Sequence, residues 1–451
     1  MDPYATYFSG YPYFYPVIGG LLDRLGGVEL ARAFSLLCMM GVTSCVYTVT
    51  QKLFSRNAAI FAAALYVSLG SVLFVGRLAT YDALCMLLLG IATVLAYQVS
   101  LKRNPWLAIW IGPLLILAVA AKYAALLFSL PVLGILILFS LQKQGWWPMV
   151  LRVVIVIVTS ALVGVLAYYF MDKAVLQGLS LTTTNRVAII QRSPWQLLVR
   201  VLQLGGIAYA LGIAGIYLLF REKRYRWLAL LLFGSSLLVP AYHIYKQEYV
   251  SLDKHMAFSL FYAMPLMGFA LSRLSGYTRQ RLSIGRHWLA GLAIVLLVFT
   301  IGTQQAETIY AGWANTTDLS YELHTQLRAG SGRYLSEDIE VARYYAEDVS
   351  DSWQWNGVNF FYYTDPQKKQ FSGNDAFTRA IDDSYFDVVE LSFNYQPYQS
   401  HFIAQQMAAS KNYNLVARVK FQNSFGIGYY YLWRKATPGQ GNFTSLSQVK
   451  Q

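Results

Sequence analysis

Charged residues are scarce in this sequence. Asp, Glu, Lys and Arg together make up 13% of its 451 residues, whereas soluble globular domains carry about 25%. Hydrophobic residues make up 56% and aromatic residues 16%, and the mean hydropathy is +0.39. This composition excludes an ordinary soluble domain and indicates a membrane protein.

Several functional motifs are missing as well. The chain has no Cys-x-x-Cys pair, no Walker phosphate loop, no His-Glu-x-x-His, no internal repeat and no low-complexity tract. Its three cysteines, Cys38, Cys45 and Cys85, lie in apolar stretches. We therefore expect small buried side chains there, and neither a disulfide nor a metal site.

The net charge of +13 does not point to a nucleic-acid partner, because of where the basic residues lie. Residues 306–451 contain 12 Lys and Arg against 15 Asp and Glu, so the basic excess belongs entirely to residues 1–305. That part of the chain is the apolar part, and we expect membrane lipids as its surroundings and no nucleic acid.

Apolar stretches of about 20 residues predict membrane-spanning helices, and the sequence contains about ten. They are Val28–Thr50, Asn57–Val75, Thr80–Ser100, Pro105–Ala121, Ala124–Leu141, Val150–Met171, Leu202–Phe220, Trp227–His243, Met256–Leu271 and Trp288–Gln304. Alternate connections carry the Lys and Arg residues, and the positive-inside rule places these connections on the cytoplasmic side. Both ends of the chain then lie outside, so we expect a further helix upstream of Met1.

Three regions follow from this pattern. Residues 1–27 are predicted to be a juxtamembrane outer loop, residues 28–305 a transmembrane domain, and residues 306–451 an extracytoplasmic α/β domain. In the last region, residues 332–348 read as a strand then a helix, residues 375–393 as a helix then a strand, and residues 413–435 as two strands joined by a turn. The fold class is thus a polytopic α-helical membrane protein with a C-terminal α/β domain.

Few acidic residues lie in the membrane part, and Asp82 is the most informative of them. In "GRLATYDALC" (residues 76–85), Arg77 and Asp82 stand at the outer start of a predicted span. Asp82 is expected either to complement the helix dipole or to belong to a site, since ionisable groups in a membrane mark functional positions.

Three basic residues are predicted on the same side. Lys122 lies in the short turn of "AKYAALLFSLP" (residues 121–131), and either extends to the headgroups or binds an anion such as a lipid phosphate. Lys254 and His255 precede another span, where such residues serve either as ordinary interfacial anchors or as parts of a phosphate site.

These stretches resemble one family. "SGYPYFYPVIGGLLDRLGGVELARAFSLL" (residues 9–37), the "RLATYDAL" helix start and the lysine turn are similar to bacterial GT-C glycosyltransferases. The branch concerned includes protein O-mannosyltransferases and the lipid A aminoarabinose transferase. The resemblance covers roughly residues 4–271. The region after it is similar only in layout.

The resemblance implies an inverting transfer of a sugar from a polyprenyl-phosphate carrier to a glycan, lipid or protein acceptor on the outer face of the plasma membrane. It gives Lys122 the role of binding the leaving phosphate, with Arg77, Lys254 and His255 as secondary candidates. A carboxylate then serves as general base, and the candidates are Asp82 and Asp2. A divalent metal ion is an open possibility for the cofactor.

The sequence departs from the family in one respect. Family members carry an acidic motif in an outer loop after a first helix, and this chain begins after that point, with Asp2 as the acid left in the stretch. Two alternatives therefore stay open. One is a transporter or flippase of lipid-linked sugars, although such proteins favour mid-membrane charges and internal repeats. The other is a non-catalytic subunit of envelope assembly.

Overall fold

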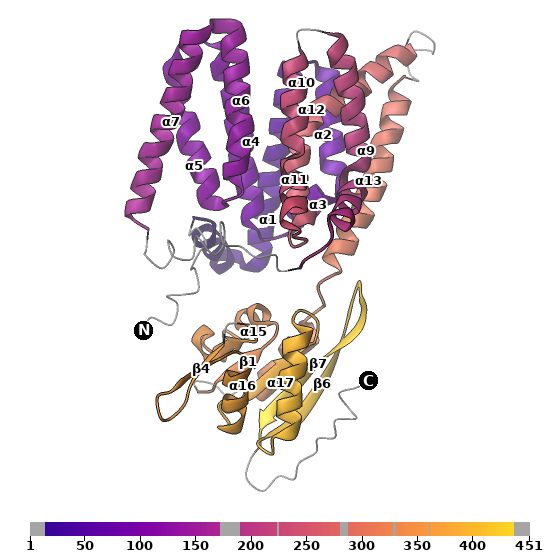
Figure 1. The fold of residues 1–451 in the computed structure, drawn as a ribbon. Helices are drawn as coiled ribbons and strands as arrows, with labels where there is room; N and C mark the ends of the chain where they lie inside the picture. The colour runs from indigo at the N-terminus through magenta and orange to yellow at the C-terminus, as the bar shows by residue number, and fades with distance from the viewer. Residues whose placement is uncertain are drawn as a thin grey trace. The chain divides into compact units, whose positions relative to one another are not determined.

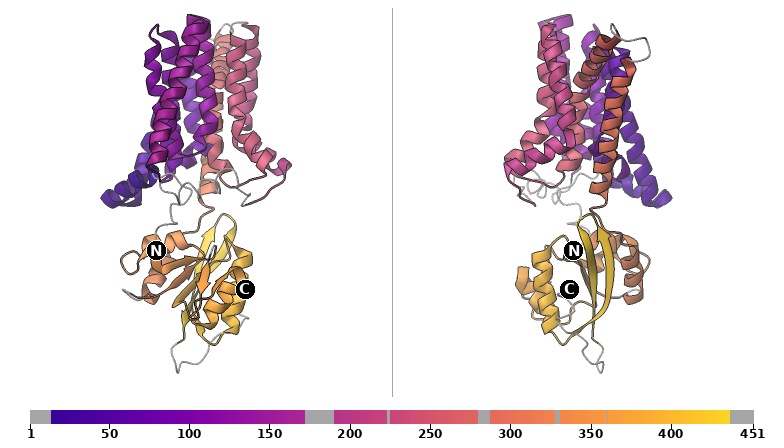
Figure 2. Two further views of the ribbon diagram at one scale, coloured as in Figure 1. Left: turned by 60° about the vertical axis from the view of Figure 1, so that its left-hand side comes forward. Right: turned by 90° about the vertical axis from the view of Figure 1, so that its right-hand side faces the viewer.

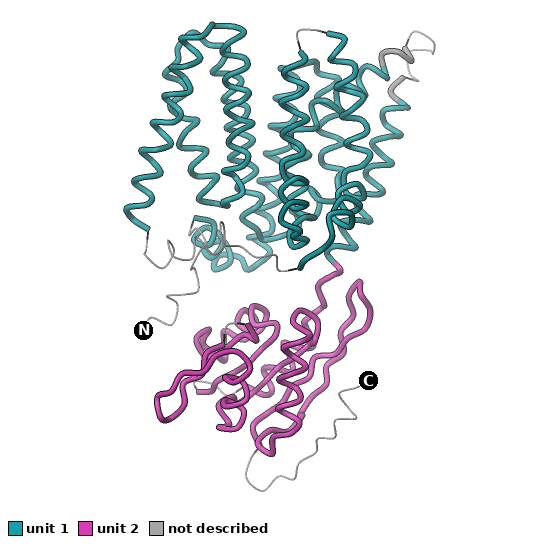
Figure 3. Tube along the Cα trace, viewed as in Figure 1, with its two compact units in different colours: residues 1–310 teal, residues 311–451 magenta. Residues whose placement is uncertain are grey.

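The computed structural model describes residues 14–171, 190–222, 225–279, 287–327, 331–359 and 361–436. The chain divides into two compact units, residues 1–310 and residues 311–451 (Figure 3). The first unit is a bundle of helices, and the second contains a β-sheet (Figure 1). The boundary follows Tyr310, a few residues beyond the predicted end of the membrane domain.

The first unit is that of a multi-pass membrane protein. Among the described residues, eight helical stretches are long and apolar enough to cross a membrane, and the bent pair α2–α3 makes a ninth. The helices are α1 (Phe14–Leu53), α2 (Arg56–Ser68), α3 (Gly70–Arg77), α4 (Tyr81–Leu101), the 3-10 helix η1 (Pro105–Trp110), α5 (Ile111–Ala121), α6 (Ala125–Gln144), α7 (Trp146–Tyr169), α9 (Pro194–Arg221), α10 (Arg226–Ser236), α11 (Leu238–Lys246), α12 (Leu252–Arg279) and α13 (His287–Tyr310).

Two expectations need correction. The stretch predicted as an outer loop, residues 1–27, is helical from Phe14 onward. This helical stretch is separated from the rest of α1 by a break in the helical backbone at Gly26 and Gly27. Gly27 has φ +68°, a conformation that glycine adopts without a steric cost. The predicted span Pro105–Ala121 is shorter than the crossing helices, so within the described residues the expected ten or so spans become eight or nine. Residues 172–189, which follow the predicted span Val150–Met171, lie outside the described residues.

Helix α12 forms the centre of the membrane unit. Of the residues in its most apolar window, 83% are buried, compared with 22% for α7 and α13. Close backbone approach makes this possible, since a Cβ atom at Gly268 would lie 2.2 Å from the carbonyl oxygen of Ala58 in α2. At Gly215 in α9, it would lie 2.4 Å from the carbonyl oxygen of Leu266. Small residues at such contacts are typical of packed membrane helices.

The second unit is an α/β domain, as the sequence predicts. Its strands are β1 (Tyr334–Ser336), β2 (Trp355–Gly357), β3 (Tyr362–Thr364), β4 (Gln370–Ser372), β5 (Val388–Leu391), β6 (Tyr413–Asn423) and β7 (Gly426–Lys435), and its helices are α14 (Thr317–Gln326), α15 (Ile339–Tyr345), α16 (Gly373–Asp382) and α17 (Pro397–Ala409). The main sheet has the order β2-β1-β5-β7-β6, with β2, β1 and β5 parallel and the β6–β7 hairpin antiparallel.

Helices lie on both faces of this sheet (Figure 2). Leu335, Val389 and Trp433 pack with α16 and α17 in one hydrophobic cluster. Their strand neighbours, among them Tyr334 and Val388, pack with α14 and α15 in the other. Successive residues of a strand point to opposite faces, so both faces of the sheet are covered by helices.

Two buried carboxyl groups stabilise the loops at the carboxyl ends of β1 and β5. Glu337 accepts hydrogen bonds of 2.6–3.0 Å from the Ser400 hydroxyl and from four backbone N–H groups of residues 392–396. Burial works to raise the pKa of Glu337, but these donors outweigh it and the pKa is lowered. Glu337 is therefore a structural carboxylate that fixes the loop leading into α17.

The pKa of Glu390 is shifted in the opposite direction from that of Glu337. One of its oxygens accepts from the Ser336 hydroxyl and the next two backbone N–H groups, while the other is buried without a hydrogen-bond partner. Burial, and next the neighbouring Asp338, raises the pKa of Glu390 well above its ordinary value. Burial and the charge of Glu337 raise the pKa of Asp338 to about 7. These two carboxyl groups are thus harder to ionise in the folded domain.

We expect the C-terminal domain to lose stability as the pH rises from 5 to 8. An unfolded Asp titrates near pH 4 and Asp338 near 7 in the folded domain, so the folded state binds the proton more tightly. The stability from this difference is full below pH 4 and is lost as the pH rises through 7. Calorimetry of the full-length protein should show the domain's Tm falling by roughly 5 °C.

Asp338→Asn is the matched variant for this measurement, because an amide cannot ionise. It should remove the part of the pH dependence that comes from Asp338, while the part from Glu390, whose pKa burial also raises, remains. The lowered pKa of Glu337 affects stability only on the acid side of this range, so it does not mask the effect. A Tm that is constant or rises over this range in the unmodified protein would contradict the assignment.

Candidate functional site

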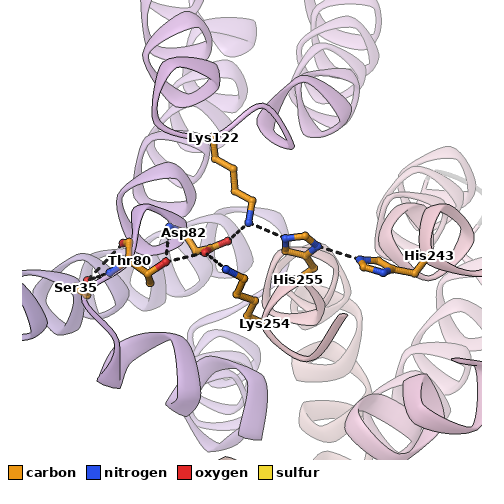
Figure 4. Close-up of polar contacts among 7 residues, drawn as sticks. All are labelled: Ser35, Thr80, Asp82, Lys122, His243, Lys254 and His255. Carbon is orange, nitrogen blue, oxygen red and sulfur yellow. Dashed lines mark hydrogen bonds and ion pairs between the residues drawn. The ribbon is translucent and has the colours of Figure 1, made fainter. Parts of the chain in front are cut away.

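Asp82 is a fully buried carboxylate in the first turn of α4. Thr80 caps this helix, since its side-chain oxygen accepts from the backbone N–H of Asp82 at 3.3 Å and its hydroxyl donates to Asp82 Oδ2 at 2.8 Å. Ser35 in α1 holds the capping residue in turn, because its hydroxyl accepts from the Thr80 backbone N–H at 3.2 Å. Ser35 thus holds Thr80 in place, and Thr80 in turn holds the Asp82 carboxylate (Figure 4).

Lys122 reaches Asp82 from a break between two apolar helices. It follows the last residue of α5 in an extended conformation, and α6 begins three residues later at Ala125. The ammonium group forms an ion pair with Asp82 Oδ1, and the side chain is only 11% exposed. Lys122 is therefore buried and paired with Asp82 and does not extend to the headgroups, while its binding of an anion stays a prediction.

Lys254 adds a second ammonium group. It lies in the first turn of α12, 3.1 Å from Asp82 Oδ2, and its side chain is 19% exposed. The Tyr81 ring faces both lysines, with its centroid 5.0 Å from Lys122 Nζ and 5.2 Å from Lys254 Nζ. The negative face of an aromatic ring favours a cation there, so Tyr81 and Asp82 hold the two ammonium groups together.

Two histidines extend this network from Lys122, and the donor and acceptor of each hydrogen bond along it can be assigned. His255 Nε2 lies 2.6 Å from Lys122 Nζ, and His255 Nδ1 lies 2.9 Å from Nε2 of His243 in α11. His243 Nδ1 lies 2.6 Å from the backbone carbonyl oxygen of Glu248. A carbonyl only accepts, so His243 donates through Nδ1 and, as a neutral ring, accepts from His255 at Nε2. Lys122 then donates to His255, and each proton in the row points away from Lys122.

Asp82, Lys122 and Lys254 together carry a net charge of +1. Such a group suits an anion with several oxygen atoms, because ammonium donors form strong hydrogen bonds to phosphate. The described residues contain no group of three His, Cys, Asp or Glu side chains that would hold a metal ion. The space between Asp82 and His255 is taken by the Lys122 ammonium, so a metal ion does not fit there as the side chains lie.

The structure brings together most of the residues singled out in the sequence. Asp82, Lys122, Lys254 and His255 form one network (Figure 4). Arg77 does not join it: its guanidinium lies over the Tyr310 ring, 4.2 Å from the centroid. The first predicted acid, Asp2, lies outside the described residues.

Sequence reasoning missed three members of the network, namely His243, Thr80 and Ser35. Thr80 carried a usable signal, because Thr two residues before an acid at a helix start is a capping pattern. His243 lies in the last turn of α11 and His255 near the start of α12, 12 residues later, but nothing in this spacing shows that the two rings meet. Ser35 lies within a long apolar helix and gave no signal.

Comparison with known proteins supports the resemblance seen in the sequence. Residues 19–168 match the profile of the dolichyl-phosphate-mannose-protein mannosyltransferase family. The crystal structure of ArnT from Cupriavidus metallidurans in the apo state covers 94% of the chain with a TM-score of 0.58 and 14% identity, and 88% of its own length is matched. The chain has the GT-C fold.

Two further structures are similar to this chain. ArnT from Cupriavidus metallidurans bound to undecaprenyl phosphate gives a TM-score of 0.61 at 13% identity, covering 96% of this chain and 89% of that one. The archaeal oligosaccharyltransferase AglB from Archaeoglobus fulgidus gives 0.49 at 13% identity, covering 96% of this chain and 68% of that one. No curated protein sequence matches the chain significantly.

We expect Asp82→Asn to destabilise the membrane unit strongly. The change removes the counter-charge of two ammonium groups that are less than a fifth exposed. Breaking a buried ion pair in this way costs about 3–5 kcal/mol. The Tm of the purified protein in detergent measures the effect, and Lys254→Gln in the same chain should recover part of the loss.

Glu222→Gln is the control, because the Glu222–Arg273 ion pair is 41% and 58% exposed. Exposed pairs contribute about 0–1 kcal/mol, so its Tm should stay close to that of the unmodified protein. Equal shifts for the two variants would show that the Asp82 network does not hold the helices together.

Proposed function

We propose that this protein transfers a sugar from a polyprenyl-phosphate carrier to an acceptor hydroxyl, on the extracytoplasmic side of the plasma membrane. The observation that carries the proposal is the buried network in which Asp82 binds the two ammonium groups of Lys122 and Lys254. The GT-C fold supports it, and one of the matched ArnT structures is bound to a polyprenyl phosphate, undecaprenyl phosphate.

The reaction breaks the bond between the anomeric carbon and the phosphate oxygen and forms one to the acceptor oxygen. The leaving group is a lipid phosphate, so negative charge develops on its oxygens in the transition state. Lys122 and Lys254 are placed to stabilise that charge, and donors already in position contribute most to such stabilisation. Attack from the opposite side of the sugar ring inverts the anomeric centre.

The acceptor hydroxyl loses a proton in the same step, and Asp82 takes it in this mechanism. Both oxygens of Asp82 are held by lysines and by Thr80. When the ammonium groups turn toward the donor phosphate, the carboxylate is released as general base. His255 orients Lys122 by accepting a hydrogen bond from one of its N–H groups, and the other N–H groups of the ammonium then bind the phosphate.

Lys122→Met should reduce kcat/KM for sugar transfer by about 100- to 1,000-fold, because it removes a donor to the developing charge. It should also weaken the binding of undecaprenyl phosphate, which is the product-like half of the donor. Lys122→Arg keeps the charge and should retain more of the binding. The measurement is transfer from a radiolabelled polyprenyl-phosphate sugar by purified protein in nanodiscs.

Lys143→Met is the control, since Lys143 is an exposed lysine in the last turn of α6. Unchanged transfer by Lys122→Met would overturn the assignment of Lys122. Movement of the lipid-linked sugar across vesicles without transfer would favour a flippase. Binding of the carrier with neither activity would favour an assembly subunit.

A further inference from the structure

The β6–β7 hairpin of the second unit ends in a turn that exposes two large apolar side chains. Ser424 and Phe425 form the turn, since Asn423 at the end of β6 pairs with Gly426 at the start of β7. Phe425 is 85% exposed, and Ile427 in β7 is 59% exposed. The Asn423 side-chain oxygen accepts from the Phe425 backbone N–H at 2.9 Å and fixes the turn. Two apolar side chains are thus presented to the outside on an ordered support.

This turn lies beside the point where the chain enters the second unit. The Ser424 backbone N–H donates to the carbonyl oxygen of Ala311 at 2.6 Å, and both residues belong to the second unit. The peptide bond joins Ala311 to Tyr310, the last residue of the apolar helix α13. Neighbouring Cα atoms are about 3.8 Å apart, so the exposed turn is held next to the end of a membrane-spanning helix.

The end of α13 lies at the level of the membrane surface. The Tyr310 ring lies 4.2 Å from the guanidinium of Arg77, the last residue of α3, where the bent span α2–α3 also ends. Tyrosine and arginine at the ends of spans are typical of the headgroup layer. Two spans therefore end together at this level, and Ala311, which holds the turn, follows directly.

The hairpin is also a basic part of an acidic domain. Residues 413–435 contain two Lys and two Arg residues and no Asp or Glu, whereas residues 306–451 carry 12 Lys and Arg against 15 Asp and Glu. Arg418 and Lys420 are exposed on β6, the strand that leads to the turn. Anionic lipids attract basic residues at a membrane surface, so the hairpin has the charge that suits such a surface.

The acidic residues of the neighbouring helix lie on the other face of the hairpin. Helix α14 carries Asp318 and Glu322, and its apolar side chains pack in one cluster with Phe421 of β6. Successive residues of a strand point to opposite faces, so Lys420 points away from the face that α14 covers. The basic face of β6 is therefore not neutralised by this helix.

A lipid surface accounts for these features better than a second copy of this chain does. Exposed apolar area is unfavourable in water, and insertion into a membrane that lies beside the turn removes it. A second copy would pair with β6, because β6 is the edge strand of the sheet. Such pairing satisfies the backbone groups of the strand and leaves Phe425, at the turn, in water.

We propose that the β6–β7 turn inserts Phe425 and Ile427 into the headgroup layer of the membrane that α13 crosses, and that this insertion anchors the C-terminal domain at the membrane surface. Arg418 and Lys420 then lie near anionic headgroups. The inference uses no part of the Asp82 network, so it does not depend on the proposed sugar transfer.

A polarity-sensitive fluorophore tests the insertion. Full-length Phe425→Cys protein is labelled with nitrobenzoxadiazole and placed in nanodiscs of phosphatidylcholine and phosphatidylglycerol. Emission should move to shorter wavelength, and lipids with a nitroxide near the headgroup should quench it, since such insertion reaches about 5–10 Å into the boundary of headgroups and acyl chains. Lys411→Cys is the control, because Lys411 is exposed just before β6, at the other end of the hairpin. The unmodified protein gives the background from native cysteines.

Polar substitutions test the anchoring role. The label is placed at Ser424→Cys, and Phe425→Ser is combined with Ile427→Ser in the same chain. The ratio of inserted to free turns, read from the quenching, should fall at least about tenfold, because two apolar side chains no longer gain from insertion. Val416→Ser is the control, since Val416 is 41% exposed on β6 but lies away from the turn. The Tm reports whether each variant is folded.

The other outcomes overturn the proposal in different ways. Equal emission and no quenching at residues 425 and 411 would show that the turn stays in water. Emission at short wavelength that nitroxide lipids do not quench would show that protein, and not lipid, covers the turn. Quenching that the serine variants leave unchanged would show that the bond to Ala311 alone keeps the turn near the membrane, without an anchoring role for its apolar side chains.

Discussion

The membrane unit depends on one buried carboxylate. Asp82 is fully buried, and a lone ionised carboxylate in such a place is strongly unfavourable. The lysines that neutralise it come from the α5–α6 break and from the start of α12, so one charge fixes three parts of the bundle at a single point. Burying three charged groups costs desolvation free energy. The close packing of α12 against α2 and α9 helps to offset this cost.

Broken helices supply the positions that this network needs. An unbroken span would place Lys122 in the middle of an apolar segment, whereas the break after α5 puts it at a helix end. The α3–α4 loop does the same for Thr80 and Asp82, and the α11–α12 connection does so for His243 and His255. Irregular backbone in a membrane protein is tolerated where it is buried or lines a cavity, so these breaks mark where polar chemistry is possible.

The sequence predicted the secondary-structure elements better than the contacts between them. Hydrophobic length identified the spans, and the alternation of residues 413–435 identified the β6–β7 hairpin, because both patterns are local. Asp82 and Lys122 were recognisable as costly charges. Their pairing was not, since it joins residues 40 positions apart. The short strands β2, β3 and β4 were missed because their pairing with other strands, which the sequence does not show, makes them strands.

Arg77 shows how sequence proximity misleads in such a protein. It lies five residues before Asp82 and was grouped with it, but the turn from α3 into α4 sends the two side chains to different places. Arg77 ends one helix and faces α13, while Asp82 begins the next and faces α5 and α12. The loop between α3 and α4 separates the two side chains within a few residues, and the buried hydrogen bond from the Thr80 backbone N–H to the Ser35 hydroxyl keeps the loop fixed.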